Sequence, residues 1–357
     1  MSRLYCMGSN GQGQLGLSHR EDIIALQEVP LPESLNKIKK LNCGGNHTIL
    51  LDSNGSIYGT GDNNESQLGL PEKVLAQFNK LQCNVKVKDI ACSWTSTLIL
   101  TEGNELLIMG KGFKGELGLG SGVVSTENKW VSVMKFKQGN TVKLYGSLQN
   151  FVVVDNSLYG SIIYGWGANT KCQLLSPKSR KVEKPTVLWE SSNTTIQEVA
   201  MGKDFFAFID DQRNLVKLTG NVPQSFDLKN RTKKDILGIH CMWTSIHLQT
   251  ANQIQSYGNN RYNQLFDNTK FDRDNVIKFV AGSEHGILVT KREDFFEVWC
   301  WGWAEHGNCG ILNGPTEVQT SIHINDQSNI SSPPNMIFKC KKEPFVYGGC
   351  ATTWIWV

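Results

Sequence analysis

The chain has 357 residues, of which 39% are hydrophobic and 34 are glycine, and its formal net charge is only +3. This near-neutral charge, without a long basic block, argues against nucleic acid as a direct partner. Many glycines beside an ample apolar fraction favour an all-β fold with numerous tight turns. We interpret the short basic clusters as solvated loops, one of which is a candidate for steering an acidic partner. They are Lys37, Lys39 and Lys40; Lys178, Arg180 and Lys181; Arg231, Lys233 and Lys234; and Lys339, Lys341 and Lys342.

The ten cysteines include no CxxC pair and lack the spacing of a zinc ribbon or finger. We expect reduced thiols, many of which pack as small apolar side chains in strands. Residues 1–13 contain no apolar signal-peptide core, and no run of about 18 apolar residues occurs anywhere. We therefore expect a soluble intracellular protein with no membrane contact, located in the cytoplasm and also in the nucleus.

An apolar stretch, a glycine and a polar loop that often ends in Gln-Leu-Gly recur along the chain. The clearest copies are residues 4–17, 57–70 and 106–119, and weaker copies lie at 163–175, 216–228, 254–266 and 298–311. A glycine at a fixed point of a strand indicates a positive φ or a close backbone approach. These anchor glycines are Gly8, Gly61, Gly110, Gly167, Gly220, Gly258 and Gly302.

A second pattern alternates strictly with the first. It consists of a small residue, a polar residue and an apolar run, and there are seven copies. This strict alternation predicts a repeat architecture. The copies begin at Cys43, Ala91, Tyr145, Met201, Cys241, Ala281 and Gly348.

Residues 47–61 predict what one unit forms. Residues 47–51 are rich in apolar and β-branched types, 52–55 (DSNG) carry turn chemistry, and 56–61 resemble a second strand, so the unit is a β-hairpin. A lone hairpin cannot bury its faces, and stacking the units in a ring leaves only short, protected edges. The sequence therefore predicts that residues 1–357 form a single domain, an all-β seven-bladed β-propeller.

The order of the patterns predicts how the ring closes. The strand expected at residues 4–8 lacks the strand that precedes it in every other unit, and residues 349–357 lack the strand that follows. We expect the N-terminal strand to pair with the C-terminal one and complete the last blade, which removes both open edges.

Neither a metal site nor a cofactor is expected. His47 and His285 occupy the same repeat position, and a position that also admits Phe and Thr is no metal ligand, so we expect hydrogen bonds to a neighbouring loop. Glu305 and His306 lie near Cys309 without zinc spacing. The residues that we align with His47 are Thr95, Gln149, Phe205, Thr244, His285 and Thr352.

No catalytic residues are predicted. The sequence has no GxSxG, HExxH or P-loop, and the phosphate-loop look of residues 112–120 follows from the repeat. An enzyme with a pocket in the central channel stays a minor alternative, because residues distant in sequence can converge.

Three tryptophans differ from those in apolar strands. Trp94 and Trp243 stand at the position that Asn46 holds, before the first hairpin strand, while Trp303 follows Gly302 at the end of the second. These two points adjoin in a hairpin, so all three should share one face. Aromatics beside charges are typical of interface hot spots, and capping of the core between blades is the alternative role. The predicted partner-binding residues are Trp94, Lys203, Asp204, Trp243, Glu284, Trp303, Glu305 and His306.

The loops ending in Gln-Leu-Gly and the Gly-x-x-His sequences resemble the regulator-of-chromosome-condensation repeat family over nearly the whole chain. Within it, certain segments are similar to a fungal branch linked to killer-toxin insensitivity. They are residues 164–174, 201–205, 241–248, 282–288, 300–310 and 348–355.

This resemblance implies a non-enzymatic scaffold that forms a heterodimer with a small acidic CSL-type zinc-finger protein, whose own cysteines hold iron or zinc. It implies a role in diphthamide synthesis on elongation factor two and in Elongator-dependent modification of tRNA wobble uridines, so the link to Elongator is indirect. Founding members of the family exchange guanine nucleotide on the small GTPase Ran and dock on nucleosomes. Exchange or regulation of a Ran-like GTPase is therefore the alternative function. The first strand is expected at about residue 4, so we expect no basic tail that would help DNA binding.

Overall fold

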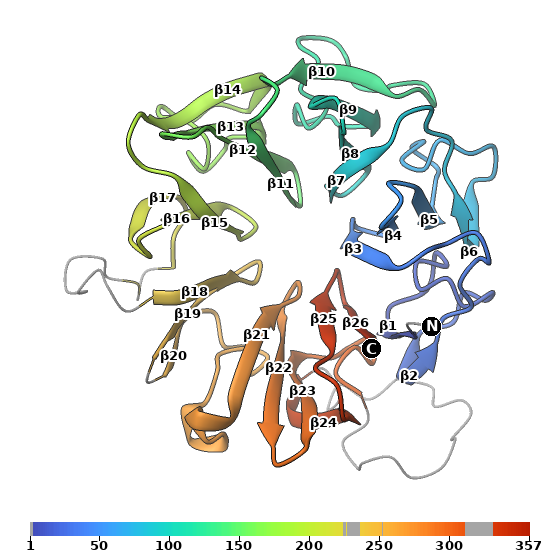
Figure 1. The fold of residues 1–357 in the computed structure, drawn as a ribbon, viewed down its shortest axis with the longest axis vertical. Coiled ribbons are helices and arrows are strands. Elements are labelled where there is room, and N and C mark those ends of the chain that lie inside the picture. Colours follow the sequence, from blue (N-terminus) through green and yellow to red (C-terminus); the bar gives the residue numbers. More distant parts are fainter. Residues whose placement is uncertain (1–2, 224–225, 227–235, 252, 311–330) are drawn as a thin grey trace.

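Strands dominate the chain and form seven sheets arranged around a central axis (Figure 1). The structure, a computed structural model, describes residues 3–223, 226, 236–251, 253–310 and 331–357. The predicted all-β seven-bladed propeller is confirmed. The weak repeat copy at 216–228 lies partly outside the described residues, and the basic cluster of Arg231, Lys233 and Lys234 lies wholly outside them.

Each blade is an antiparallel sheet, and its first strand lies nearest the axis (Figure 1). Blade 1 contains β3 (Ile38–Cys43), β4 (His47–Asp52), β5 (Ile57–Asp62) and β6 (Val74–Lys80). Blade 2 contains β7 (Val87–Cys92), β8 (Ser96–Thr101), β9 (Glu105–Gly110) and β10 (Val131–Lys135). Blade 3 contains β11 (Thr141–Ser147), β12 (Asn150–Asn156), β13 (Ser161–Ala168) and β14 (Lys181–Ser191).

The remaining blades follow the same order. Blade 4 contains β15 (Ile196–Met201), β16 (Phe205–Asp210) and β17 (Leu215–Gly220). Blade 5 contains β18 (Ile236–Cys241), β19 (Ser245–Thr250) and β20 (Ile254–Gly258), followed by the short helices η1 (Asn268–Lys270) and η2 (Arg273–Asn275). Blade 6 contains β21 (Val276–Ala281), β22 (His285–Arg292), β23 (Phe295–Trp303) and β24 (Ser331–Cys340). Blade 7 contains β25 (Phe345–Gly348), β26 (Thr352–Trp356), β1 (Leu4–Gly8) and β2 (Ile23–Glu28).

The core lies between neighbouring sheets. Every residue of the second strands β4, β8 and β16 is buried, because both faces of these strands are covered by adjacent blades. Leu4 and Trp354 of blade 7 pack with Leu41 and Tyr58 of blade 1 in one such layer. Each fully buried apolar side chain of this kind contributes about 1.5–3 kcal/mol of transfer free energy.

The anchor glycines have the positive φ that the repeat predicted. Gly61, with φ +102°, shows why: a Cβ there would collide with the carbonyl oxygen of Asn46 in the adjoining loop. The same conformation holds the ends of the third strands against the loops that precede the second strands. The φ angles at Gly8, Gly110, Gly167, Gly220, Gly258 and Gly302 lie between +89° and +123°.

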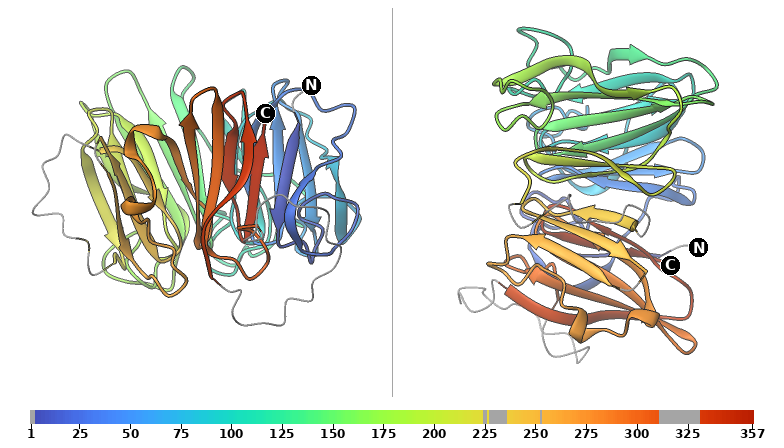
Figure 2. Two further views of the ribbon diagram at one scale, coloured as in Figure 1. Left: turned by 90° about the horizontal axis from the view of Figure 1, so that it is seen from below. Right: turned by 90° about the vertical axis from the view of Figure 1, so that its left-hand side faces the viewer.

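The predicted ring closure is confirmed. β1 pairs with β26 from Leu4 opposite Trp356 to Gly8 opposite Thr352, and β2 covers the other edge of β1. The two termini therefore lie side by side in blade 7 (Figure 2).

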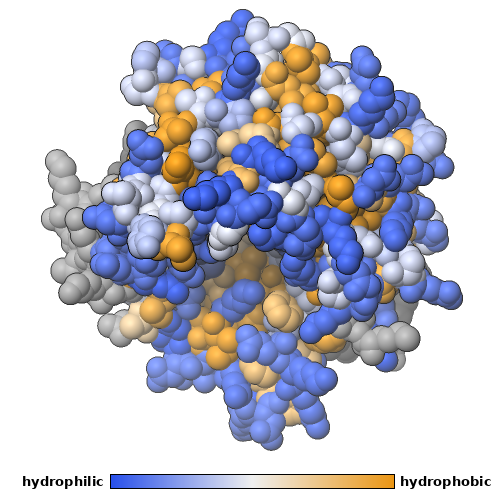
Figure 3. All heavy atoms as spheres, turned by 45° about the horizontal axis from the view of Figure 1, so that its top comes forward, coloured by the Kyte–Doolittle hydropathy of each residue, from blue (hydrophilic) through white to orange (hydrophobic). Residues whose placement is uncertain are grey.

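The first strands of all blades run in the same sense and surround a channel. We call the opening where they end the upper mouth and the opening where they begin the lower mouth. The face around the upper mouth carries the loops after the first and third strands, and we call it the upper face. The space-filling view shows the ring hollowed near its centre (Figure 3). In the described part of the chain, no helix has the length and apolar character needed to span a membrane.

Candidate partner-binding face

A collar of backbone hydrogen bonds joins the loops around the upper mouth. At five of the seven junctions between neighbouring blades, an N–H group at the loop tip donates to a carbonyl of the next blade, so these loops are held together. The bonds run from Gly45 to Trp94 (3.1 Å), Trp94 to Leu148 (2.9 Å), Lys203 to Trp243 (2.9 Å), Trp243 to Ser283 (2.7 Å) and Ser283 to Gly349 (3.0 Å).

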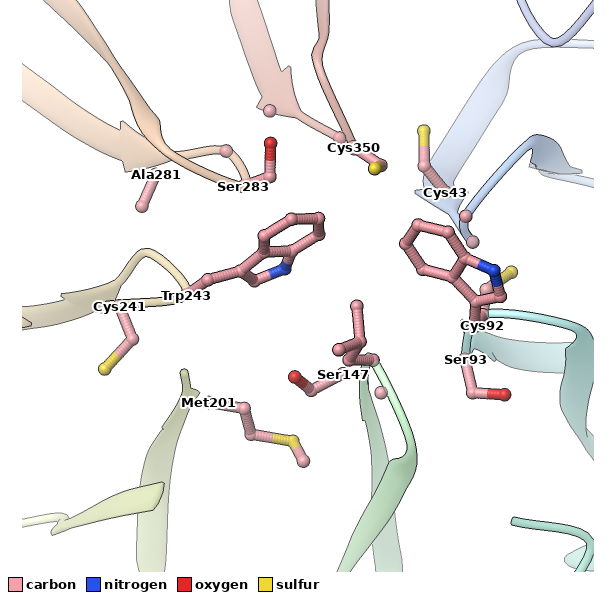
Figure 4. Close-up of a pocket in the computed structure, with 18 of the residues that line it drawn as sticks. Cys43, Cys92, Ser93, Ser147, Met201, Cys241, Trp243, Ala281, Ser283 and Cys350 are labelled. Atoms are coloured by element: carbon pink, nitrogen blue, oxygen red, sulfur yellow. The ribbon is translucent and has the colours of Figure 1, made fainter. Parts of the chain in front are cut away.

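Trp94 and Trp243 meet across this mouth. Their ring centroids are 6.2 Å apart with an interplanar angle of 49°, although one belongs to blade 2 and the other to blade 5. Trp94 is 39% exposed and lies against Gly45, where a Cβ would come within 2.6 Å of the indole. Trp243 lies over the opening in Figure 4. The pair therefore spans the mouth instead of capping the core between adjacent blades.

The position of these tryptophans in the repeat differs from the prediction by one residue. Ser96 and Ser245 pair with anchor glycines as His47 does, so Trp94 and Trp243 are equivalent to Gly45 and not to Asn46. The predicted alignment of His47 with Thr95, Gln149 and Thr244 was wrong by the same step, because strand pairing fixes the register and the linear sequence does not show it. The correction places both indoles at loop tips over the channel.

A cavity opens beside Trp243. It has a volume of about 470 Å³, and Lys203, which donates its N–H to Trp243, is exposed next to it. Two predicted residues, Asp204 and Trp243, therefore line one depression with a mixed polar and apolar wall. Its lining residues are Asp204, Phe205, Asn221, Val222, Pro223, Trp243, Thr244, Gly258 and Asn259.

Glu284 is placed differently from its predicted neighbours, because it is only 7% exposed. Its carboxylate accepts hydrogen bonds from Thr244 Oγ1 (2.7 Å) and Gln264 Nε2 (3.1 Å), and its backbone oxygen accepts one from the Trp303 N–H (3.0 Å). Burial raises the pKa of this carboxyl group. Glu284 thus links blade 5 to blade 6 from within the rim.

Trp303, Glu305 and His306 form a separate group farther along the rim. The Trp303 Nε1–H donates to Glu305 Oε2 (3.2 Å). The ring centroids of Trp303 and His306 are 5.6 Å apart. A 2.7 Å hydrogen bond joins His306 Nδ1 to Asp22 Oδ2 of blade 7 and raises the pKa of His306. Burial pushes the pKa of Asp22 upward, but the bonds from His306 and the Asn10 N–H leave it below its usual value.

Four cysteines line the upper mouth, and this cluster was not predicted. Cys43, Cys92 and Cys241 each end the first strand of their blade, and Cys350 lies in the loop between β25 and β26. Together they surround a separate cavity of about 160 Å³ (Figure 4). Cys43, Cys92 and Cys241 recur at one position of the repeat, and this recurrence was the signal in the sequence. Burial raises the pKa of Cys43 and Cys350 to about 12, so these thiols stay protonated at neutral pH and are poor nucleophiles.

His47 and His285 hold blades together. The Nε2–H of each imidazole donates to a threonine hydroxyl of the following blade, Thr97 for His47 and Thr353 for His285, at 3.1 Å, because each hydroxyl gives its own proton to a backbone carbonyl. Thr97 in turn donates to the Gln67 carbonyl (2.7 Å), so the predicted bond to a neighbouring loop runs through a threonine. Burial lowers the pKa of both imidazoles to about 4. No group of three or more potential His, Cys, Asp or Glu metal ligands occurs within the described residues.

The loop at residues 112–120 is filled by its own carboxylate. Glu116 is buried and accepts a 2.6 Å hydrogen bond from the Lys114 N–H, where a phosphate would need a free donor. The glycines of this loop therefore serve the repeat, as predicted.

Two overlapping segments match a model of the regulator of chromosome condensation (RCC1) repeat, at residues 2–51 and 38–67. The repeats continue around the whole ring in the structure. The chain is therefore similar to the RCC1 repeat family, whose repeat models match residues 2–67. An RCC1 repeat-containing protein of Schizosaccharomyces pombe is 27% identical over 339 residues, which cover 85% of this chain and 88% of that protein. The human X-linked retinitis pigmentosa GTPase regulator is 42% identical over 71 residues, only 19% of this chain and 7% of that protein.

Solved RCC1-type propellers share the fold. Human WBSCR16 superposes with a TM-score of 0.76 at 17% identity, covering 100% of this chain and 99% of that one. Yeast RCC1 (Prp20), solved bound to Kap60, superposes with a TM-score of 0.74 at 17% identity, covering 99% and 88%. At these identities the likeness shows the fold alone.

Proposed function

We propose that this RCC1-repeat propeller is a non-enzymatic scaffold whose upper face binds a small acidic CSL-type zinc-finger protein. One observation carries the proposal. The segments that resemble the killer-toxin-insensitivity branch, 201–205, 241–248, 282–288 and 348–355, come from different blades but all contribute residues to the upper mouth. Segment 300–310 adds the Trp303 group on the same rim.

The chemistry of the face suits such a partner. The two facing indoles supply rigid apolar area at a small entropic cost, as hot-spot residues do. Exposed cations stand on the loops around them and favour an acidic surface. These cations are Arg20, Lys171, Lys203 and Arg261.

In this proposal the propeller supplies binding and the partner's metal supplies the chemistry. The heterodimer acts in the cytoplasm, in diphthamide synthesis on elongation factor two and in wobble-uridine modification of tRNA, so contact with Elongator is indirect. The propeller itself lends support, because burial raises the pKa of the Cys43 and Cys350 thiols and the described residues contain no group of three or more potential metal ligands.

A second candidate is exchange or regulation of a Ran-like GTPase. Short matches to proteins named as a GTPase regulator and as a secretion-regulating guanine nucleotide exchange factor favour it. Two measurements separate the candidates: titration calorimetry with the zinc-finger protein, and release of a fluorescent guanine nucleotide from a Ran-like GTPase. The first candidate requires tight one-to-one binding without accelerated release. Accelerated release without binding of the zinc-finger protein would replace it with the second.

A further inference from the structure

The first strands share an irregularity at the lower mouth. In five blades a β-bulge sets one residue of the strand outside the ladder, and a bulged residue is free to turn its side chain outward. The bulged residues are Lys39, Lys88, Gln197, Leu237 and Ile277. The two strands without this bulge carry Lys143 near the start of β11 and Phe345 at the start of β25.

These residues separate by character around the ring. Leu237, Ile277 and Phe345 stand on the consecutive blades 5, 6 and 7 and are 50%, 39% and 56% exposed. We call them the apolar arc. Phe345 is held in place, since its ring stacks on Trp356 at 5.1 Å and Lys278 Nζ lies 5.7 Å from its centroid. A fixed aromatic beside two exposed aliphatic side chains forms a contact surface that needs little ordering on binding.

Lys39, Lys88 and Lys143 stand on blades 1, 2 and 3 and form what we call the basic arc. Their ammonium groups donate to neutral acceptors, the Lys88 carbonyl (2.9 Å), Asn104 Oδ1 (3.1 Å) and the Gln197 carbonyl (3.0 Å) respectively. Among the described residues, none of these three lysines takes part in a salt bridge. The basic arc therefore presents positive charge that the described part of the chain leaves unneutralised.

We propose that the lower mouth is a docking site for a peptide segment of a partner protein, with acidic residues at one end and large aliphatic residues at the other. The positive charge of the basic arc selects acidic residues at one end of the peptide, and the apolar arc selects aliphatic residues at the other end. The site lies on the opposite side of the ring from the upper face, so it is independent of the function proposed there.

The composition of the apolar arc decides between classes of partner. Single-stranded RNA binds basic grooves by stacking successive bases on aromatic rings, and Phe345 is the one aromatic residue of the apolar arc, already stacked on Trp356. An anionic membrane favours apolar residues surrounded by cations, whereas here the two arcs occupy different blades. The two arcs adjoin where blade 7 packs on blade 1, and an extended segment of about 12 residues reaches roughly 40 Å along them.

A random dodecapeptide display library tests the proposal. The library is first depleted on a variant carrying Lys39→Glu, Lys88→Glu, Leu237→Ser and Ile277→Ser, and then selected on the unmodified protein. We expect the recovered peptides to combine several Asp or Glu with at least two Leu, Ile or Val. Fluorescence anisotropy then measures the affinity of these peptides for two double variants. Lys39→Glu with Lys88→Glu, and Leu237→Ser with Ile277→Ser, should each lower that affinity at least tenfold.

Matched controls make the result specific. Lys129→Glu with Val123→Ser alters an exposed lysine and an exposed aliphatic residue away from the lower mouth and should leave peptide affinity unchanged. Melting curves should show every variant folded, because all the changed side chains are at least partly exposed. Recovery of no discriminating peptide, or of peptides without acidic residues, would overturn the proposal. So would binding of phosphatidylserine vesicles or polyuridine that the lower-mouth variants abolish while peptide binding persists.

Discussion

The indole rings of Trp94 and Trp243, contributed by blades 2 and 5, lie 6.2 Å apart over the upper mouth. Because each ring supports the other, we expect Trp94→Ala and Trp243→Ala each to weaken binding of the zinc-finger partner by about 2 kcal/mol, or roughly thirtyfold in affinity. The double variant should lose less than the sum, since the residues are in contact. Titration calorimetry measures these affinities, and melting curves should shift much less.

Trp130→Ala is the matched control for this pair. Its indole nitrogen donates to the Gln82 carbonyl (3.1 Å) away from the mouth, so partner affinity should not change. Early melting with normal binding in both mouth variants would show that the indoles only stabilise the collar, and the interface would then lie elsewhere.

Glu284 and Glu305 should respond oppositely to truncation. Glu284→Ala leaves Thr244 and Gln264 without their acceptor and should lower the free energy of unfolding by about 1–3 kcal/mol. Its buried carboxylate cannot reach a partner, so affinity should persist in the folded fraction. Glu305→Ala changes an exposed residue and should alter stability by less than about 0.5 kcal/mol while reducing affinity. Urea unfolding and calorimetry separate the two effects, and an unstable Glu305 variant would contradict this assignment.

Acid should unfold the ring through its buried imidazoles. The pKa of His47 and of His285 is lowered from 6.5 to about 4, so the folded state binds the proton less readily than the unfolded chain. Stability should therefore be full above pH 6.5 and decline toward pH 4, by about 1.4 kcal/mol per pH unit for each histidine. Urea unfolding at stepped pH measures this slope. The double variant His47→Gln, His285→Gln should reduce this slope without abolishing it, because burial also lowers the pKa of His240 to about 4 and of His247 to about 3. The variant starts from a lower stability at neutral pH, and an unchanged slope would exclude His47 and His285.

Deletion of residues 349–357 tests the closure of blade 7. It removes β26, so β1 and β25 both lose their neighbour and expose unpaired edges. We expect aggregation, measured by size-exclusion chromatography with light scattering. A monomeric truncation that unfolds cooperatively would show that the ring is held without this pairing.

Much of the fold could be predicted because each repeat specifies its strands and turns by short local sequence patterns. The anchor glycine at position 61 and the turn at residues 52–55 specify a hairpin without knowledge of the rest. The site depends on distances that sequence does not contain. That Trp94 faces Trp243 follows from the diameter of the ring, and the one-residue error in their register arose because loops of similar polarity align equally well either way. Glu284 looked exposed because it stands in a polar loop, yet Gln264 and Thr244 from blade 5 cover it.

The pairing of β1 with β26 has a consequence for how the protein is made. Residues 4–8 are synthesised before the other six blades, whereas their partners at 352–356 are synthesised after them. Until β26 has been synthesised, β1 has at most β2 beside it, and a two-stranded hairpin alone is marginally stable. The other six blades consist of strands close together in sequence and are able to form as they emerge. Blade 7 must therefore assemble after the rest, so β1 keeps an unpaired, aggregation-prone edge until the other six blades have been synthesised.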